Sequence, residues 1–135
     1  MSALPGIAEL RQIHRDTFAE HASAFRLSPN PEKLLQALCS TTDRTVRAIW
    51  QLSAMPENCC LIATGGYGRG ELFPHSDVDL LLLTPKLSET GTSRIEAFVS
   101  ACWDVGLQIG HSVRTIEECL QESRQDITVQ TSLLE

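Results

Sequence analysis

Residues 61–83 read LIATGGYGRGELFPHSDVDLLLL, and this stretch decides which fold the sequence predicts. An apolar run at 60–64, bounded by turn residues, predicts a buried strand. A glycine-rich stretch follows at 65–70 and is expected to form a loop. A proline-containing turn at 74–76 then leads into a second predicted strand at 77–83. The stretch therefore predicts two strands joined by a glycine-rich connection.

Two acidic residues open the second predicted strand. Residues two apart on a strand project to the same face, so Asp77 and Asp79 are expected to lie side by side while Val78 points into the core. Neighbouring carboxylates repel each other, and both ionise readily at neutral pH only with a cation beside them. Mg²⁺ fits, because it takes oxygen ligands and is usually completed by water and substrate phosphates. The pair therefore predicts a Mg²⁺ site that orients a phosphate for in-line displacement.

The glycine-rich stretch supports the same chemistry. Gly65 and Gly66 lack side chains, so their backbone N–H groups can approach a triphosphate closely, and Arg69 is a cationic partner for phosphates. Taken separately, Asp-x-Asp is often a solvated strand edge and a glycine cluster is usually a turn. Their ordered combination favours function, because two acids at the start of an apolar strand are an inconsistency that folding alone would not select.

Helices are predicted on both sides of these strands. Upstream, apolar spacing predicts helices at 7–26 and 31–53, the second opened by a capping Asn30 and by Pro31. Downstream, the pattern predicts a loop at 84–93, a helix at 94–105, a strand at 107–114, and helices at 115–124 and 127–135. We therefore expect an α/β (α+β) fold, with a small mixed sheet of about three to five strands flanked by helices.

Composition sets limits on the function. The chain has 135 residues, enough for one domain, and a net charge of −6, which argues against a general nucleic-acid binder. The longest apolar run, 80–83, is too short to cross a membrane, and the start lacks the features of a signal peptide. Five cysteines without metal spacing indicate idle thiols in a reducing compartment, so a cytoplasmic location is expected.

The motif at 65–72 (GGYGRGEL), followed by SDVDL at 76–80, resembles the polymerase-β-like nucleotidyltransferase superfamily, and within it the bacterial PII uridylyltransferases. The likeness extends to three further segments: WDVGL at 103–107, GHSVRT at 110–115 and DITVQTSLLE at 126–135. It identifies 60–135 as a nucleotidyltransferase core, with 1–59 as a helical lead-in. The last predicted helix stops in mid-pattern, so we expect the core to be truncated at the C-terminus.

The resemblance implies a polymerase-β-like fold and transfer of UMP from UTP to a tyrosine of the signalling protein PII, with release of pyrophosphate. It also implies that Asp77 and Asp79 hold Mg²⁺ while Gly65 and Gly66 line the nucleotide phosphates. Arg69 and Ser76 complete the set of residues expected to bind nucleotide.

A third carboxylate is less clearly marked. The wider superfamily usually takes one from a later strand, but the predicted strand at 107–114 has no acid. Asp126 lies in a segment that resembles the family and is the candidate for the third catalytic acid. The alternative is that Asp126 caps the last helix.

Two other functions remain open. An adenylyltransferase or a stand-alone small nucleotidyltransferase would keep the chemistry and change the substrate. A regulatory module that binds nucleotide without catalysis would explain both the short chain and the missing third acid.

Overall fold

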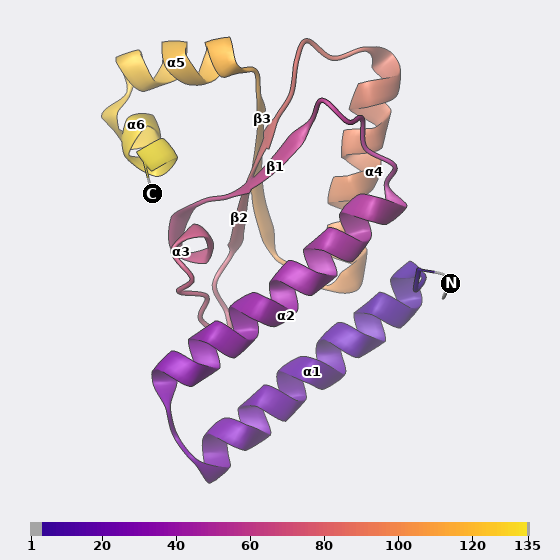
Figure 1. The fold of residues 1–135 in the computed structure, drawn as a ribbon, viewed down its shortest axis with the longest axis vertical. Coiled ribbons are helices and arrows are strands. Elements are labelled where there is room, and N and C mark those ends of the chain that lie inside the picture. Colours follow the sequence, from indigo (N-terminus) through magenta and orange to yellow (C-terminus); the bar gives the residue numbers. More distant parts are fainter. Residues whose placement is uncertain (1–3, 135) are drawn as a thin grey trace.

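Helices surround a three-stranded sheet in the computed structural model, which describes residues 4–134 (Figure 1). In chain order the elements are α1 (Ile7–Leu27), α2 (Pro31–Leu52), β1 (Cys60–Ala63), α3 (Gly65–Gly68), β2 (Val78–Leu83), α4 (Glu89–Val105), β3 (Ile109–Arg114), α5 (Ile116–Gln125) and α6 (Ile127–Leu134). The predicted α/β class with a small mixed sheet is confirmed. No helix among the described residues is both long and apolar enough to cross a membrane.

The sheet has the order β1-β2-β3 and is mixed. Strand β1 runs antiparallel to β2, with Ile62 opposite Leu81, whereas β2 and β3 are parallel, with Asp79 opposite Gly110. Parallel neighbours require a crossover connection, and α4 supplies it. The central strand is therefore β2, the strand that carries Asp79.

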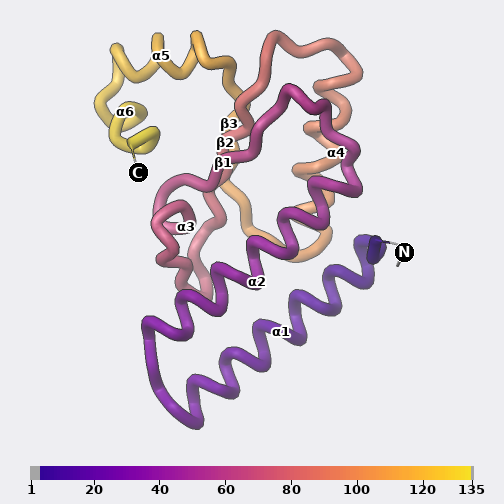
Figure 2. Tube along the Cα trace, viewed as in Figure 1, coloured from indigo at the N-terminus to yellow at the C-terminus, as the bar shows by residue number. Residues whose placement is uncertain are grey.

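The two faces of β2 differ, because successive side chains alternate across a strand. Val78, Leu80 and Leu82 belong to the main hydrophobic core. This confirms that Val78 points inward, and it places Asp79 on the opposite face. Figure 2 shows α1, α2 and α4 on one side of the strands and α3, α5 and α6 on the other.

The two N-terminal helices share the core of the sheet. Ile49 of α2 and Phe98 of α4 are fully buried in the same cluster as Leu82, and the Trp50 ring meets the Phe98 ring edge-on at 5.3 Å between centroids. Residues on both sides of position 59 thus form one core. The division into a 1–59 lead-in and a 60–135 core stays a prediction.

Most element boundaries lie within two residues of those predicted, for example β3 at Ile109–Arg114 rather than 107–114, and three differences bear on the site or on a helix start. The glycine-rich stretch forms the one-turn helix α3 instead of an open loop. Helix α4 begins at Glu89 rather than at 94, because the Ser88 hydroxyl accepts a hydrogen bond from the Gly91 backbone N–H at 3.2 Å and so caps the helix earlier. Strand β2 begins at Val78, whose N–H donates to the Gln108 carbonyl at 2.8 Å, and not at residue 77.

Burial of His14 is expected to make the stability of this fold depend on pH. Burial lowers the pKa of His14 below its ordinary value of 6.5, and its Nδ1 lies 2.9 Å from the Thr45 hydroxyl of α2. The unfolded chain therefore takes up this proton at a higher pH than the folded chain. We expect this contribution to the free energy of unfolding to be constant well above pH 6.5 and to fall as the pH drops below it. Denaturant unfolding of wild type and His14→Gln from about pH 8 to about pH 5 measures it.

In that series the wild type should lose more stability on acidification than His14→Gln. His75 lies exposed in a turn, so His75→Gln is a matched control that should keep the wild-type pH dependence. Equal losses in wild type and His14→Gln would contradict the assignment.

Thr42 of α2 offers a stabilising substitution. Its side chain is fully buried, and within the described residues its Oγ1 has no hydrogen-bond partner. Valine is also β-branched and replaces the hydroxyl with a methyl group. We expect Thr42→Val to raise the free energy of unfolding by about 1 kcal/mol, because an unsatisfied buried hydroxyl is removed.

Thermal or denaturant unfolding measures the effect of Thr42→Val. Thr41→Val is the control, because it removes the 2.8 Å hydrogen bond between Thr41 and His21 and should destabilise by about 1 kcal/mol. A Thr42→Val protein no more stable than wild type would show that the hydroxyl is satisfied in solution.

Candidate functional site

The Asp79 carboxylate lies in a narrow space between two glycines. A Cβ atom added to Gly65 of α3 would lie 2.6 Å from Asp79 Oδ2, and one added to Gly110 of β3 would lie 2.8 Å from Oδ1. The Thr64 backbone N–H also donates to the Asp79 carbonyl at 3.0 Å. Both glycines are therefore needed for this carboxylate to occupy its position.

The one-turn helix α3 brings the predicted phosphate-binding residues beside Asp79. Gly65 has φ +61°, a left-handed conformation that favours glycine. A Cβ on Gly68 would lie 2.7 Å from the Ala63 carbonyl, so α3 packs tightly onto the end of β1. A Cβ on Gly66 would lie 3.7 Å from the Arg69 guanidinium. The structure thus gathers the glycine turn, one acid and one cation.

Arg69 lies at the exposed rim of this turn. Its Nε is 3.3 Å from Glu71 Oε2, and the two side chains are 42% and 57% exposed. An ion pair this open to water stabilises a protein by at most about 1 kcal/mol. The Arg69–Glu71 ion pair therefore orients the guanidinium but contributes little to the stability of the fold.

Ser76 and Asp77 lie in the segment that leads into β2. The Ser76 hydroxyl accepts a hydrogen bond from the Phe73 N–H at 3.2 Å, and the Ser76 N–H donates to the Phe73 carbonyl at 3.1 Å. The serine therefore closes the turn before the strand. Asp77 is exposed and precedes Val78 directly. That Ser76 binds nucleotide, and that Asp77 and Asp79 share one Mg²⁺, stay predictions.

Asp126 lies at the junction of α5 and α6. Its Oδ1 accepts a hydrogen bond from the Thr128 N–H at 2.8 Å, which is the capping geometry that the sequence left open as an alternative. Among residues 4–134, no three His, Cys, Asp or Glu side chains gather into a group that could hold a metal ion. The structure therefore does not join Asp126 to Asp77 and Asp79 in a three-acid cluster, and its catalytic role stays a prediction.

Two residues next to this site were missed by the sequence reasoning. Gly110 faces Asp79 only because β2 and β3 pair in parallel register, although a glycine inside a strand is itself a signal of close approach. Asp43 of α2 accepts a hydrogen bond from the Tyr67 hydroxyl of α3. No local pattern links these two positions, which are 24 residues apart.

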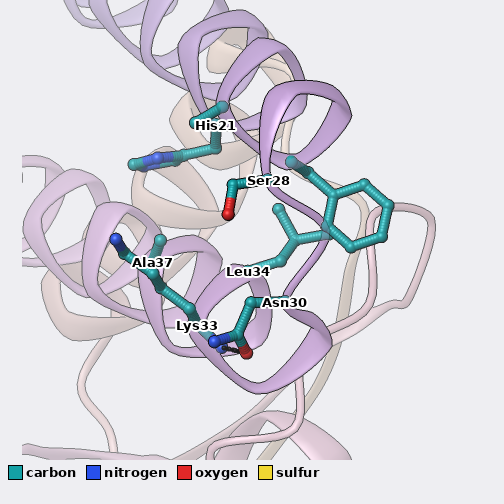
Figure 3. A pocket seen from close by; sticks show the side chains of 8 residues that line it. His21, Ser28, Asn30, Lys33, Leu34 and Ala37 are labelled. Atoms are coloured by element: carbon teal, nitrogen blue, oxygen red, sulfur yellow. Dashed lines mark hydrogen bonds between the residues drawn. The ribbon is translucent and has the colours of Figure 1, made fainter.

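Figure 3 shows a pocket that belongs to a different part of the molecule. It has a volume of about 170 Å³ and lies between the end of α1 and the start of α2, where His21, Phe25 and Lys33 line it. It contains none of the predicted site residues, so it is separate from the site around Asp79.

The site thus consists of a mixed sheet with an acidic residue on its central strand, packed against a glycine turn. The chain belongs to the nucleotidyltransferase family described as "Putative nucleotidyltransferase DUF294", whose model matches residues 8–112. The match includes α1 and α2, so the family likeness is not confined to 60–135.

Within this class the chain is similar to bifunctional uridylyltransferase/uridylyl-removing enzymes. It is 48% identical to those of Ralstonia nicotianae over 126 residues and Bordetella parapertussis over 127 residues, and 45% identical to that of Burkholderia mallei over 134 residues. The alignments cover 93%, 93% and 98% of this chain but only 15% of each relative. The chain thus spans about 15% of the length of these relatives. No solved structure matches it.

Proposed function

We propose that this chain transfers UMP from UTP to a tyrosine of the nitrogen-regulatory protein PII and releases pyrophosphate. Membership of the nucleotidyltransferase family supports the reaction class, and the activity named for the relatives supports uridylyl transfer. The observation that carries the proposal is the Asp79 carboxylate held between Gly65 and Gly110, beside a glycine turn.

The side chains at this site fit Mg²⁺, the proposed cofactor. Asp77 and Asp79 would hold it, because a hard cation prefers carboxylate oxygens and takes the rest of its ligands from water and phosphates. The absent side chains of Gly65 and Gly110 keep methyl groups away from both Asp79 oxygens. When bound, the ion would neutralise charge that develops on the α-phosphate and on the leaving pyrophosphate.

The remaining predicted residues have roles in binding the triphosphate. The backbone of Gly65 and Gly66 and the Arg69 guanidinium would hold the phosphates, with Ser76 at the edge of the site. The acceptor hydroxyl oxygen attacks the α-phosphorus, the bond to the bridging oxygen breaks, and pyrophosphate leaves. The acceptor proton passes to a nearby carboxylate or to water. A cytoplasmic location and a role in nitrogen regulation belong to the same proposal.

A second candidate is a module that binds nucleotide without catalysis. The observation that favours it is the lack of a three-acid metal group in the part of the chain that the structure describes. The two functions differ in product formation, so one assay separates them.

The test presents the chain with PII, Mg²⁺ and each of UTP, ATP, CTP and GTP, and follows acceptor mass and pyrophosphate release. The expected result is that PII gains the mass of one UMP when UTP is supplied and gains no mass with ATP, CTP or GTP. A chelator that removes the metal should abolish this transfer. A preference for ATP would overturn the uridylyl assignment in favour of an adenylyltransferase. Binding of Mg²⁺–UTP without transfer to any acceptor would favour the non-catalytic module.

A further inference from the structure

The short helix α3 contains one residue with a side chain that can anchor it to the rest of the protein. Three of its four residues are glycines, and the fourth is Tyr67. The Tyr67 side chain is only 6% exposed, so its ring packs inside the protein and offers no open face for a base to stack on. Glycine-rich backbone is mobile unless other contacts restrain it. The position of α3 therefore depends strongly on Tyr67.

The partner of Tyr67 lies on a long and well-anchored helix. The Tyr67 hydroxyl donates a hydrogen bond to the Asp43 carboxylate of α2, a 22-residue helix. Thr42 and Val46 of α2, on either side of Asp43 in the chain, are buried. Burial and the neighbouring Asp43 charge both raise the pKa of Tyr67, so its hydroxyl stays protonated and able to donate.

The opposite end of α3 contacts the proposed metal ligand. Gly65 lies so near Asp79 that a Cβ there would be 2.6 Å from its Oδ2. A groove of about 390 Å³ between α2 and β1 is lined by both Asp43 and Tyr67, so the hydrogen bond spans a place where the helix and the sheet are not fully packed. A series of contacts thus runs from α2 through Tyr67 and Gly65 to Asp79.

We infer that Tyr67 and Asp43 are positioning residues for nucleotidyl transfer, because their hydrogen bond holds the turn at 65–68 against the Asp79 carboxylate. This inference rests on the proposed function. Neither residue touches the reacting atoms, and each acts through the placement of the glycine turn.

Steady-state kinetics on four variants of this chain test the inference. Tyr67→Phe keeps the ring and removes only the hydroxyl, and Asp43→Ala removes the acceptor from an exposed position. Each should raise the KM for Mg²⁺–UTP about tenfold with a smaller change in kcat, since part of the binding free energy must then place the turn that the hydrogen bond to a charged group had held. Asp43→Asn retains an acceptor oxygen but loses the charge, so its KM should lie between those of wild type and Asp43→Ala. The double variant Tyr67→Phe/Asp43→Ala should be no worse than either single variant.

Thr41→Val is the matched control. It removes a hydrogen bond of α2 to His21 of α1 without touching α3, so it should lower the unfolding temperature and leave the KM unchanged. If Tyr67→Phe and Asp43→Ala lower only the unfolding temperature and keep the wild-type KM, their role is purely structural and the inference is overturned. Additive losses in the double variant would overturn it as well.

Calorimetric binding of Mg²⁺–UTP separates this inference from the proposed function. If the wild type binds but transfers nothing, the proposed function fails, and the Kd values of the same variants still decide whether the hydrogen bond holds the turn in place for nucleotide binding. Weaker binding in Tyr67→Phe then supports it, and an unchanged Kd overturns it. A wild type that neither binds nor transfers overturns both.

Discussion

Asp79→Asn is expected to lower the rate of nucleotidyl transfer by a factor on the order of 1,000 while the chain stays folded. The substitution keeps the shape of the side chain but removes the negative charge that would hold Mg²⁺. A bound metal contributes several kcal/mol of charge stabilisation in such reactions, and each 1.36 kcal/mol corresponds to about a factor of ten in rate. The rate of pyrophosphate release at saturating Mg²⁺–UTP and PII measures the effect.

Asp104→Asn is the matched control for Asp79→Asn. Asp104 is exposed on α4, on the other side of the sheet from α3, and its substitution should leave the rate unchanged (Figure 1). An Asp79→Asn rate within tenfold of wild type would show that this carboxylate does not carry the metal.

The second large effect is expected from Gly110→Ala, which adds one methyl group 2.8 Å from Asp79 Oδ1. Either the carboxylate rotates away or β3 shifts, and both move the proposed metal ligand. Because a displacement of about 1 Å at a reacting centre can cost about 100-fold in rate, we expect a loss of that order. The kcat of the variant, with its unfolding temperature, measures the loss.

Two further glycine variants distinguish the effect of crowding Asp79 from the effects of an added methyl group in open space and of backbone strain. Gly6→Ala adds a methyl group that meets no atom within 4 Å and should leave both activity and stability near wild type. Gly70→Ala strains a residue at φ +77° that also has open space around it, so it should lower stability more than activity. Full activity in Gly110→Ala would mean that the gap beside Asp79 is not needed for transfer.

The sequence predicted the elements whose signals are local. The apolar period of 3.6 located α1 and α2, and the period of two placed Val78 in the core and Asp79 on the other face. It missed α3, because a segment rich in glycine has low helix propensity, and this turn is held by the hydrogen bond of Tyr67 to α2 and by the close approach of its glycines to β1 and Asp79. It began α4 too late, because the polar residues after Ser88 carry no apolar period until Ile95.

The residues of the site also fall into those that a local motif predicted and those that it did not. Gly65, Gly66 and Arg69 are close in sequence to Asp79, so one motif predicted them together. Gly110 and Asp43 come from distant segments, and they reach the site only through strand register and helix packing, which no local pattern encodes. For Asp126 the sequence left two roles open, and the structure shows the hydrogen bond from the Thr128 N–H to its Oδ1 that the capping role requires.

A crystal of this chain grown with Mn²⁺ and a non-hydrolysable UTP analogue gives the most direct test of the site. Anomalous scattering should place the metal between the carboxylates of Asp77 and Asp79, with the triphosphate on the turn at 65–68. Metal and triphosphate bound elsewhere, with the oxygens of Asp77 and Asp79 diverging and holding no ion, would contradict the assignment of this site to nucleotidyl transfer.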